Sequence, residues 1–147
     1  MIADAQSDPA AIELGNFFPQ HPEEVWRALT DPDLLARWLF RPIGFVAVVG
    51  ARFHFAIPEE PGQEIHCEVL AVRSFHQLTY TWRYLRTEHP ECWTVDWSLI
   101  PQGRGTRLLL TQTGFDITNR RQRMLRNAME RGWKRSLLPR LGEAIHH

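Results

Sequence analysis

Two cysteines and seven histidines are the side chains of this 147-residue chain best suited to nucleophilic or metal chemistry. Cys67 and Cys92 lie far apart and lack CxxC spacing, which favours reduced thiols in a cytosolic protein over a disulfide. A nucleophilic thiol needs a lowered pKa and a neighbouring base. His66 adjoins Cys67 but points to the opposite face of a strand. We therefore interpret both cysteines as buried or half-buried, inert thiols.

The histidines show neither the HExxH motif nor any compact ligand spacing. His54 and His66 form the one pair worth testing, because they could meet across adjacent strands. Asp96 and Glu68 have no partner in sequence that would make an acid–base pair. No nucleophile elbow, phosphate loop or dinucleotide fingerprint is present. We expect no catalytic residue, no metal and no cofactor, and we favour a binding protein over an enzyme.

Aromatic residues are the most informative feature of the composition. The chain has six Trp and eight Phe, and each such ring can bury ~150–250 Å², so these rings must dominate a core or line a cavity. Alternation over 78–84 and 93–99 puts the large side chains on one face of two strands. A filled core and a ligand cavity with flat apolar walls both remain open. The predicted cavity residues are Trp38, Phe53, Phe55, Trp82, Trp93, Trp97, Met129 and Trp133.

These side chains must be positioned by an α+β domain over residues 11–147, preceded by a flexible N-terminus at 1–10. A first strand (11–18) is followed by two short helices, because Pro22 and Pro32 suit first-turn positions and Asp31 suits an N-cap. From Ile43 the hydrophobic period is two, which predicts consecutive antiparallel hairpins. One hairpin turn is expected at 59–62.

From Thr118 the apolar period becomes helical, which predicts a final helix of about 25 residues, or roughly 38 Å. Thr118 is the expected N-cap. Pro139 should kink the helix or end a continuous stretch, because it removes a backbone donor. Gly132 at the helix centre indicates either close packing or cavity space.

The final helix is strongly basic, but the formal net charge of the chain is zero, which argues against general affinity for nucleic acid. We expect a solvated helix face, with the option that one Arg points inward at a ligand carboxylate. The first residues lack an apolar run, and no stretch approaches the ~18 apolar residues that suggest a bilayer span. The expectation is a cytoplasmic protein that binds neither nucleic acid nor membrane.

The order of elements resembles the helix-grip fold of the START-related and birch-pollen-allergen (SRPBCC) superfamily, a curved sheet of six to seven strands around a long C-terminal helix. Within it, the sequence is similar to the family named after the activator of the heat-shock-protein-90 ATPase. Two departures are Val49-Gly50-Ala51, where the family has a Pro-Gly-Gly-like turn, and Gln112, where it often has His. The matching segments are PEEVWRALTDP (22–32) followed by Trp38, LTYTW (78–82), VDWSL (95–99) with GTRL (105–108), TGF (113–115) and Gly132-Trp133.

The resemblance implies an internal cavity between the sheet and the last helix that binds a small hydrophobic or amphipathic molecule. Two alternatives are a cyclase- or dehydratase-type enzyme that uses the same cavity and a cochaperone-like protein-interaction module. A protein partner and a homodimer stay open. Catalysis predicts two titratable groups within hydrogen-bond reach inside the cavity, whereas a cochaperone role predicts an exposed patch instead of a cavity.

Overall fold

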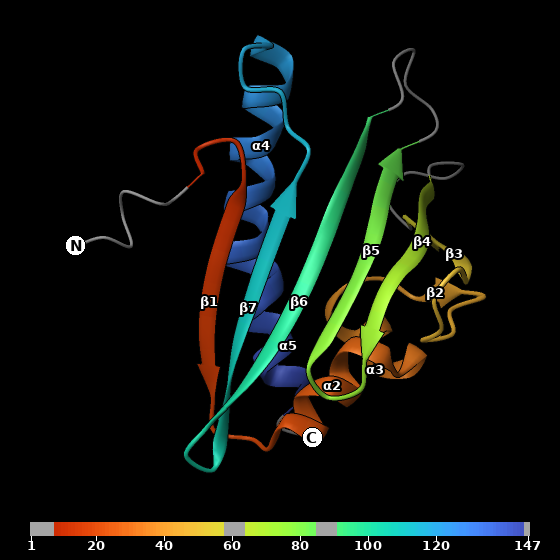
Figure 1. Ribbon diagram of the computed structural model, residues 1–147, viewed down its shortest axis with the longest axis vertical. Coiled ribbons are helices and arrows are strands. Elements are labelled where there is room, and N and C mark those ends of the chain that lie inside the picture. Colours follow the sequence, from red (N-terminus) through yellow and green to blue (C-terminus); the bar gives the residue numbers. More distant parts are fainter. Residues whose placement is uncertain (1–7, 58–63, 85–90, 146–147) are drawn as a thin grey trace.

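Seven antiparallel strands form one sheet in the order β1-β7-β6-β5-β4-β3-β2 (Figure 1). The computed structural model describes residues 8–57, 64–84 and 91–145. Strands β2 to β7 pair with their neighbours in chain order, and β1 returns to pair with β7, which confirms the predicted meander. The expected turn at 59–62 and most of the N-terminus lie outside the described residues. The strands are β1 (Ile12–Phe18), β2 (Pro42–Ile43), β3 (Arg52–Ala56), β4 (Glu64–Arg73), β5 (Gln77–Tyr84), β6 (Cys92–Gln102) and β7 (Gly105–Thr113).

The two short helices after β1 are α2 (Pro22–Thr30) and α3 (Pro32–Trp38). Each begins with a proline, whose missing N–H costs nothing in the first turn. Asp31 caps α3 as predicted, because its carboxylate accepts hydrogen bonds from the backbone N–H groups of Asp33 (2.8 Å) and Leu34 (3.3 Å).

The C-terminal helix consists of α4 (Arg120–Gly132), a π-helical segment η1 (Trp133–Leu137) and α5 (Leu138–Ile145). The expected interruption therefore falls just before Pro139. The backbone N–H of Leu138 bonds to the carbonyl of Trp133, five residues back. Proline has no N–H and its ring crowds the preceding turn, so the wider π turn accommodates it.

The predicted cap of this helix was wrong by one residue. Asn119 is the N-cap, and its side chain accepts a hydrogen bond from the N–H of Gln122 at 3.1 Å. The Thr118 hydroxyl instead donates to the Asp116 carboxylate at 2.5 Å. That carboxylate also accepts from the Thr118 backbone N–H, and these two bonds lower the pKa of the exposed Asp116. A competing local hydrogen bond thus takes the residue that the periodicity favoured.

The helices lie on one side of the sheet (Figure 1). At one end α5 packs against α2 and α3. Strand alternation turns the large aromatic residues toward these helices and polar residues away from them. By contrast, α4 has no fully buried residue. Within the described ranges, no helix is both long and apolar enough to cross a bilayer.

Candidate functional site

The aromatic residues predicted to line a cavity lie together on the inner side of the sheet. Seven of them are buried, and Met129 of α4 is half-buried against the same cluster. The buried residues are Trp38, Phe53, Phe55, Trp82, Trp93, Trp97 and Trp133. Three strands, α3 and the start of η1 therefore supply one aromatic interior.

Within this interior the rings pack mainly edge to face. Trp97 contacts Trp38 and Trp133 with ring centroids 5.8 and 5.5 Å apart, and Trp133 contacts Trp82 at 5.8 Å. Phe55 continues the contacts on the other side of Trp82 at 5.9 Å. Such pairs add about 0.5–1.5 kcal/mol each beyond area burial. These rings therefore form part of the packed core, whatever space remains beside them.

Three of the buried indoles have hydrogen-bond partners for their N–H groups. Trp38 donates to the carbonyl of Ala28 (2.8 Å), and Trp97 donates to the Tyr80 hydroxyl (3.0 Å). Burial, with the Cys67 thiol as a smaller cause, raises the pKa of Tyr80 far above its usual range. The phenol therefore stays neutral, consistent with its place in an apolar interior.

Gln112 is a site residue that the sequence analysis treated only as a departure from the family pattern. Its side chain is fully buried, and its amide oxygen accepts a hydrogen bond from Trp133 at 2.9 Å. Its amide nitrogen donates to the Met129 sulfur at 3.7 Å, and a thioether is a weak acceptor. Strand parity could have found it, because Gln112 has the same inward parity as Leu108 and Leu110.

A groove of about 600 Å³ runs along one flank of α4. Leu125 belongs both to its wall and to the side chains packed on the core, whereas Met124 is 60% exposed. Three exposed arginines stand among these apolar side chains. In the described part of the chain the wall consists of Arg120, Arg121, Met124, Leu125, Ala128 and Arg131.

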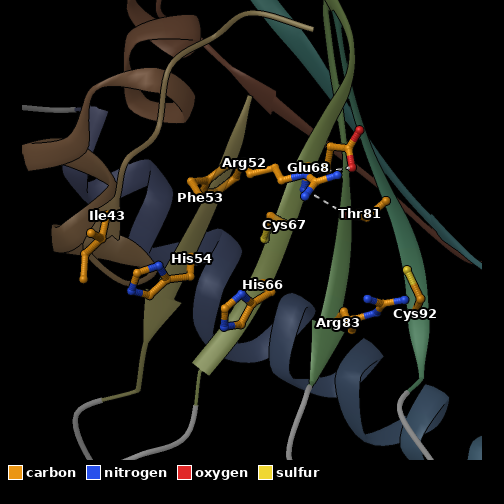
Figure 2. Close-up of a pocket in the computed structure, with 10 residues that line it drawn as sticks. All are labelled: Ile43, Arg52, Phe53, His54, His66, Cys67, Glu68, Thr81, Arg83 and Cys92. Atoms are coloured by element: carbon orange, nitrogen blue, oxygen red, sulfur yellow. Dashed lines mark hydrogen bonds and ion pairs between the residues drawn. The ribbon is translucent and has the colours of Figure 1, made fainter. Parts of the chain in front are cut away.

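A second groove, of about 430 Å³, lies on the opposite, outer face of the sheet (Figure 2). Polar groups of this lining are partly paired already: Arg52 lies 3.6 Å from the Glu68 carboxylate, and His66 Nε2 lies 2.9 Å from the Glu64 carboxylate. Of the predicted cavity residues, only Phe53 contributes to its described lining. The lining residues are Ile43, Arg52, Phe53, His54, His66, Cys67, Glu68, Thr81, Arg83 and Cys92.

His54 and His66 do meet across β3 and β4, as the sequence suggested. Their rings stack with centroids 5.4 Å apart. The Glu64 carboxylate contacts both rings, 2.9 Å from His66 Nε2 and 3.6 Å from His54 Nε2. Among the described residues, no three His, Cys, Asp or Glu side chains are arranged to hold a metal ion.

The two cysteines are free thiols in different environments. Cys67 is buried as predicted, and burial, with a smaller contribution from Cys92, raises its pKa far above the usual range. For Cys92 the prediction of burial was wrong, because the side chain lies at the exposed start of β6.

We expect one thiol to react with Ellman's reagent in the native protein at pH 8 and two in denaturant. The thiolate is the reactive form, and Cys67 stays protonated at that pH. Cys92→Ser should abolish the native reaction, whereas Cys67→Ser should leave it unchanged. Two fast-reacting thiols in the native protein would contradict the described burial of Cys67.

The sheet gripping a C-terminal helix, with an aromatic interior between them, defines a helix-grip α+β protein of the SRPBCC type. The family model "Activator of Hsp90 ATPase homolog 1-like protein" matches residues 20–146, and the chain belongs to this family. No match to a curated protein was found.

Solved structures share the fold over nearly the whole chain. Protein MLL2253 from Mesorhizobium loti is 29% identical, with a TM-score of 0.82 over 92% of this chain and 96% of that one. CalU16 from Micromonospora echinospora is 25% identical, with a TM-score of 0.73 over 92% and 75% of the two chains. Protein CV1439 from Chromobacterium violaceum is 23% identical, with a TM-score of 0.77 over 95% and 99%. The predicted fold and family are therefore confirmed.

Proposed function

We propose that the protein binds a small hydrophobic or amphipathic molecule between α4 and the aromatic face of the sheet. The observation that carries this proposal is the groove along α4. A helix of 13 residues contains Met124, Leu125 and Ala128 on one flank, yet has no fully buried residue. Its apolar flank instead borders a space of about 600 Å³, which lies within the ~300–1,000 Å³ range of small-molecule sites.

The chemistry of the groove supports the same ligand class. Apolar side chains that remain in contact with water forgo about 25 cal/mol for each Å² that a ligand could cover. Arg121 already pairs with Glu91, but Arg120 and Arg131 can interact with a polar end of the ligand while its apolar body covers Met124 and Leu125. The outer groove is a weaker candidate, because its described lining is mostly polar and partly paired already.

The alternative of an enzyme that uses this groove receives less support. The described wall contributes arginines but neither a carboxylate nor an imidazole, so it supplies no pair for proton transfer. The described pair of that kind, His66 and Glu64, lies on the outer face instead. Binding without chemistry is therefore our proposal for the α4 groove.

Equilibrium dialysis with fluorene, a rigid apolar tricycle, tests the site directly. We expect saturable binding that Ala128→Trp weakens at least tenfold, because the new ring fills the groove. Asn127→Trp is the matched control: it adds the same ring at an exposed neighbouring position outside the described wall and should bind fluorene like the parent. Equal binding by both variants, or no saturable binding by the parent, would refute the proposal. Native mass spectrometry of protein purified from its own host would then identify a co-purifying ligand.

A further inference from the structure

Trp82 and Trp93 each bury an indole N–H that has no hydrogen-bond partner among the described residues. Both side chains are almost inaccessible, at 3% and 1% exposure. An indole nitrogen can only donate, and a buried donor without an acceptor forfeits the hydrogen bonds it made to water. Two such groups in one small interior need an explanation.

The two indoles are neighbours in the sheet and lie near α4. Trp82 and Trp93 pair directly across β5 and β6, on the inner face. Trp82 contacts Trp133, which adjoins the end of α4. Gln112 pairs with Val95, two residues along β6 from Trp93 and on the same face. Its underused amide N–H faces Met129 of α4. Three neighbouring strands therefore carry these donors on the inner face of the sheet.

Two side-chain acceptors of this region, in the described part of the chain, are already in use. Gln112 Oε1 accepts from Trp133, and Tyr80 Oη accepts from Trp97. The interior is thus rich in donors and poor in free acceptors. Resting on the proposed function, we infer that the ligand of this site is a flat, neutral molecule bearing a carbonyl oxygen, which accepts hydrogen bonds from Trp82 and Trp93. Neither indole belongs to the described groove wall, so the ligand must extend from the groove into the interior, and the flexible, half-buried Met129 side chain must turn aside to admit it.

The shape and charge of the ligand follow from the surroundings of the two indoles. Trp82 contacts the rings of Phe55 and Trp133, and Trp93 contacts the ring of Phe115. Aromatic walls of this kind favour a planar apolar ligand. The arginines in the described groove wall are exposed. The terminal nitrogens of Arg126 are engaged by Glu130 and by the carbonyl of Ala11, so its charge is already matched, although its buried Nε has no partner among the described residues. A carboxylate beside the indoles would be buried without a cation, which is far more costly than burying a neutral carbonyl.

The test compares 9-fluorenone with fluorene, which differ by one carbonyl, in equilibrium dialysis against the full chain. If the site offered no hydrogen-bond donor, fluorenone would bind more weakly than fluorene, because its carbonyl would lose water without gaining a donor. If Trp82 and Trp93 donate to the carbonyl, fluorenone should instead bind roughly tenfold tighter than fluorene. Trp82→Phe and Trp93→Phe, which keep an aromatic ring but remove the N–H, should each abolish this preference. Trp26→Phe, a change on α2, should retain it. Fluorene-9-carboxylate should bind more weakly than fluorenone.

The outcomes separate this inference from the proposed function. If fluorene binds as tightly as fluorenone, or if the preference survives both Phe variants, the site stands and the hydrogen-bonding role of the indoles is refuted. Tighter binding of the carboxylate refutes the neutral ligand. If neither tricycle binds, both proposals fail. The indole N–H resonances of the unmodified protein give a readout that needs no variant to fold: fluorenone should shift those of Trp82 and Trp93 downfield, and unchanged resonances would refute the inference.

Discussion

Replacing Trp133 with alanine should lower the free energy of unfolding by about 3–5 kcal/mol, the range of buried aromatic-to-alanine changes. The ring is 2% exposed and lies between Trp82 and Trp97. Its removal leaves a cavity and also strips Gln112 Oε1 of its donor. Urea denaturation followed by circular dichroism would measure the change.

Met124→Ala is the matched control for this experiment. Met124 lies on the same helix system but is 60% exposed, so its removal should change the unfolding free energy by no more than about 0.5 kcal/mol. Trp133→Phe should fall between the two, because it keeps part of the packing and still leaves Gln112 unpaired. A loss below about 1 kcal/mol for Trp133→Ala would mean that η1 does not hold this ring against the sheet.

The inner face of the sheet could be predicted because its signal is local. Alternation over β5 and β6 assigns Tyr80, Trp82, Trp93 and Trp97 to one side, and a one-residue error would reverse them all. The starts of α2 and α3 were equally readable from Pro22 and Pro32, as was the Asp31 cap of α3. The cap of α4 was not, because two hydroxyl- or amide-bearing residues, Thr118 and Asn119, stood side by side and a local bond to Asp116 decided between them.

The site itself depends on distances that no local pattern contains. Whether an indole N–H has an acceptor depends on distant parts of the chain: Trp97 donates to Tyr80 and Trp133 to Gln112, whereas Trp82 and Trp93 have no acceptor within the described ranges. Likewise, helical periodicity assigned Met129 and Trp133 to the sheet but could not show that the flank with Met124 and Ala128 borders a groove. The predicted cavity residues therefore identify the interior, while the groove wall required the fold.

Gly105 and Gly132 offer one substitution, glycine to alanine, with opposite expected results. A Cβ at Gly105 would lie 2.4 Å from the carbonyl oxygen of Phe18 and 2.7 Å from the Phe17 ring. Because the first of these is backbone of the paired strand β1, Gly105→Ala must push β1 away from β7. Overpacking of this kind costs about 1–3 kcal/mol. A Cβ at Gly132 meets nothing within 4 Å, so Gly132→Ala should stabilise the protein by up to about 1 kcal/mol through helix propensity.

Comparing the two alanine variants isolates the contact between β1 and β7. Both remove the same glycine freedom from the unfolded chain, so this contribution cancels in the difference between their unfolding free energies. That difference should be about 1–3 kcal/mol, the crowding cost at Gly105, because the helix gain at Gly132 is chiefly the same glycine entropy. Gly132 is also absent from the described groove wall, so Gly132→Ala should bind fluorene like the parent. Equal unfolding free energies for the two variants would mean that β1 can move away from β7 without a measurable cost in stability.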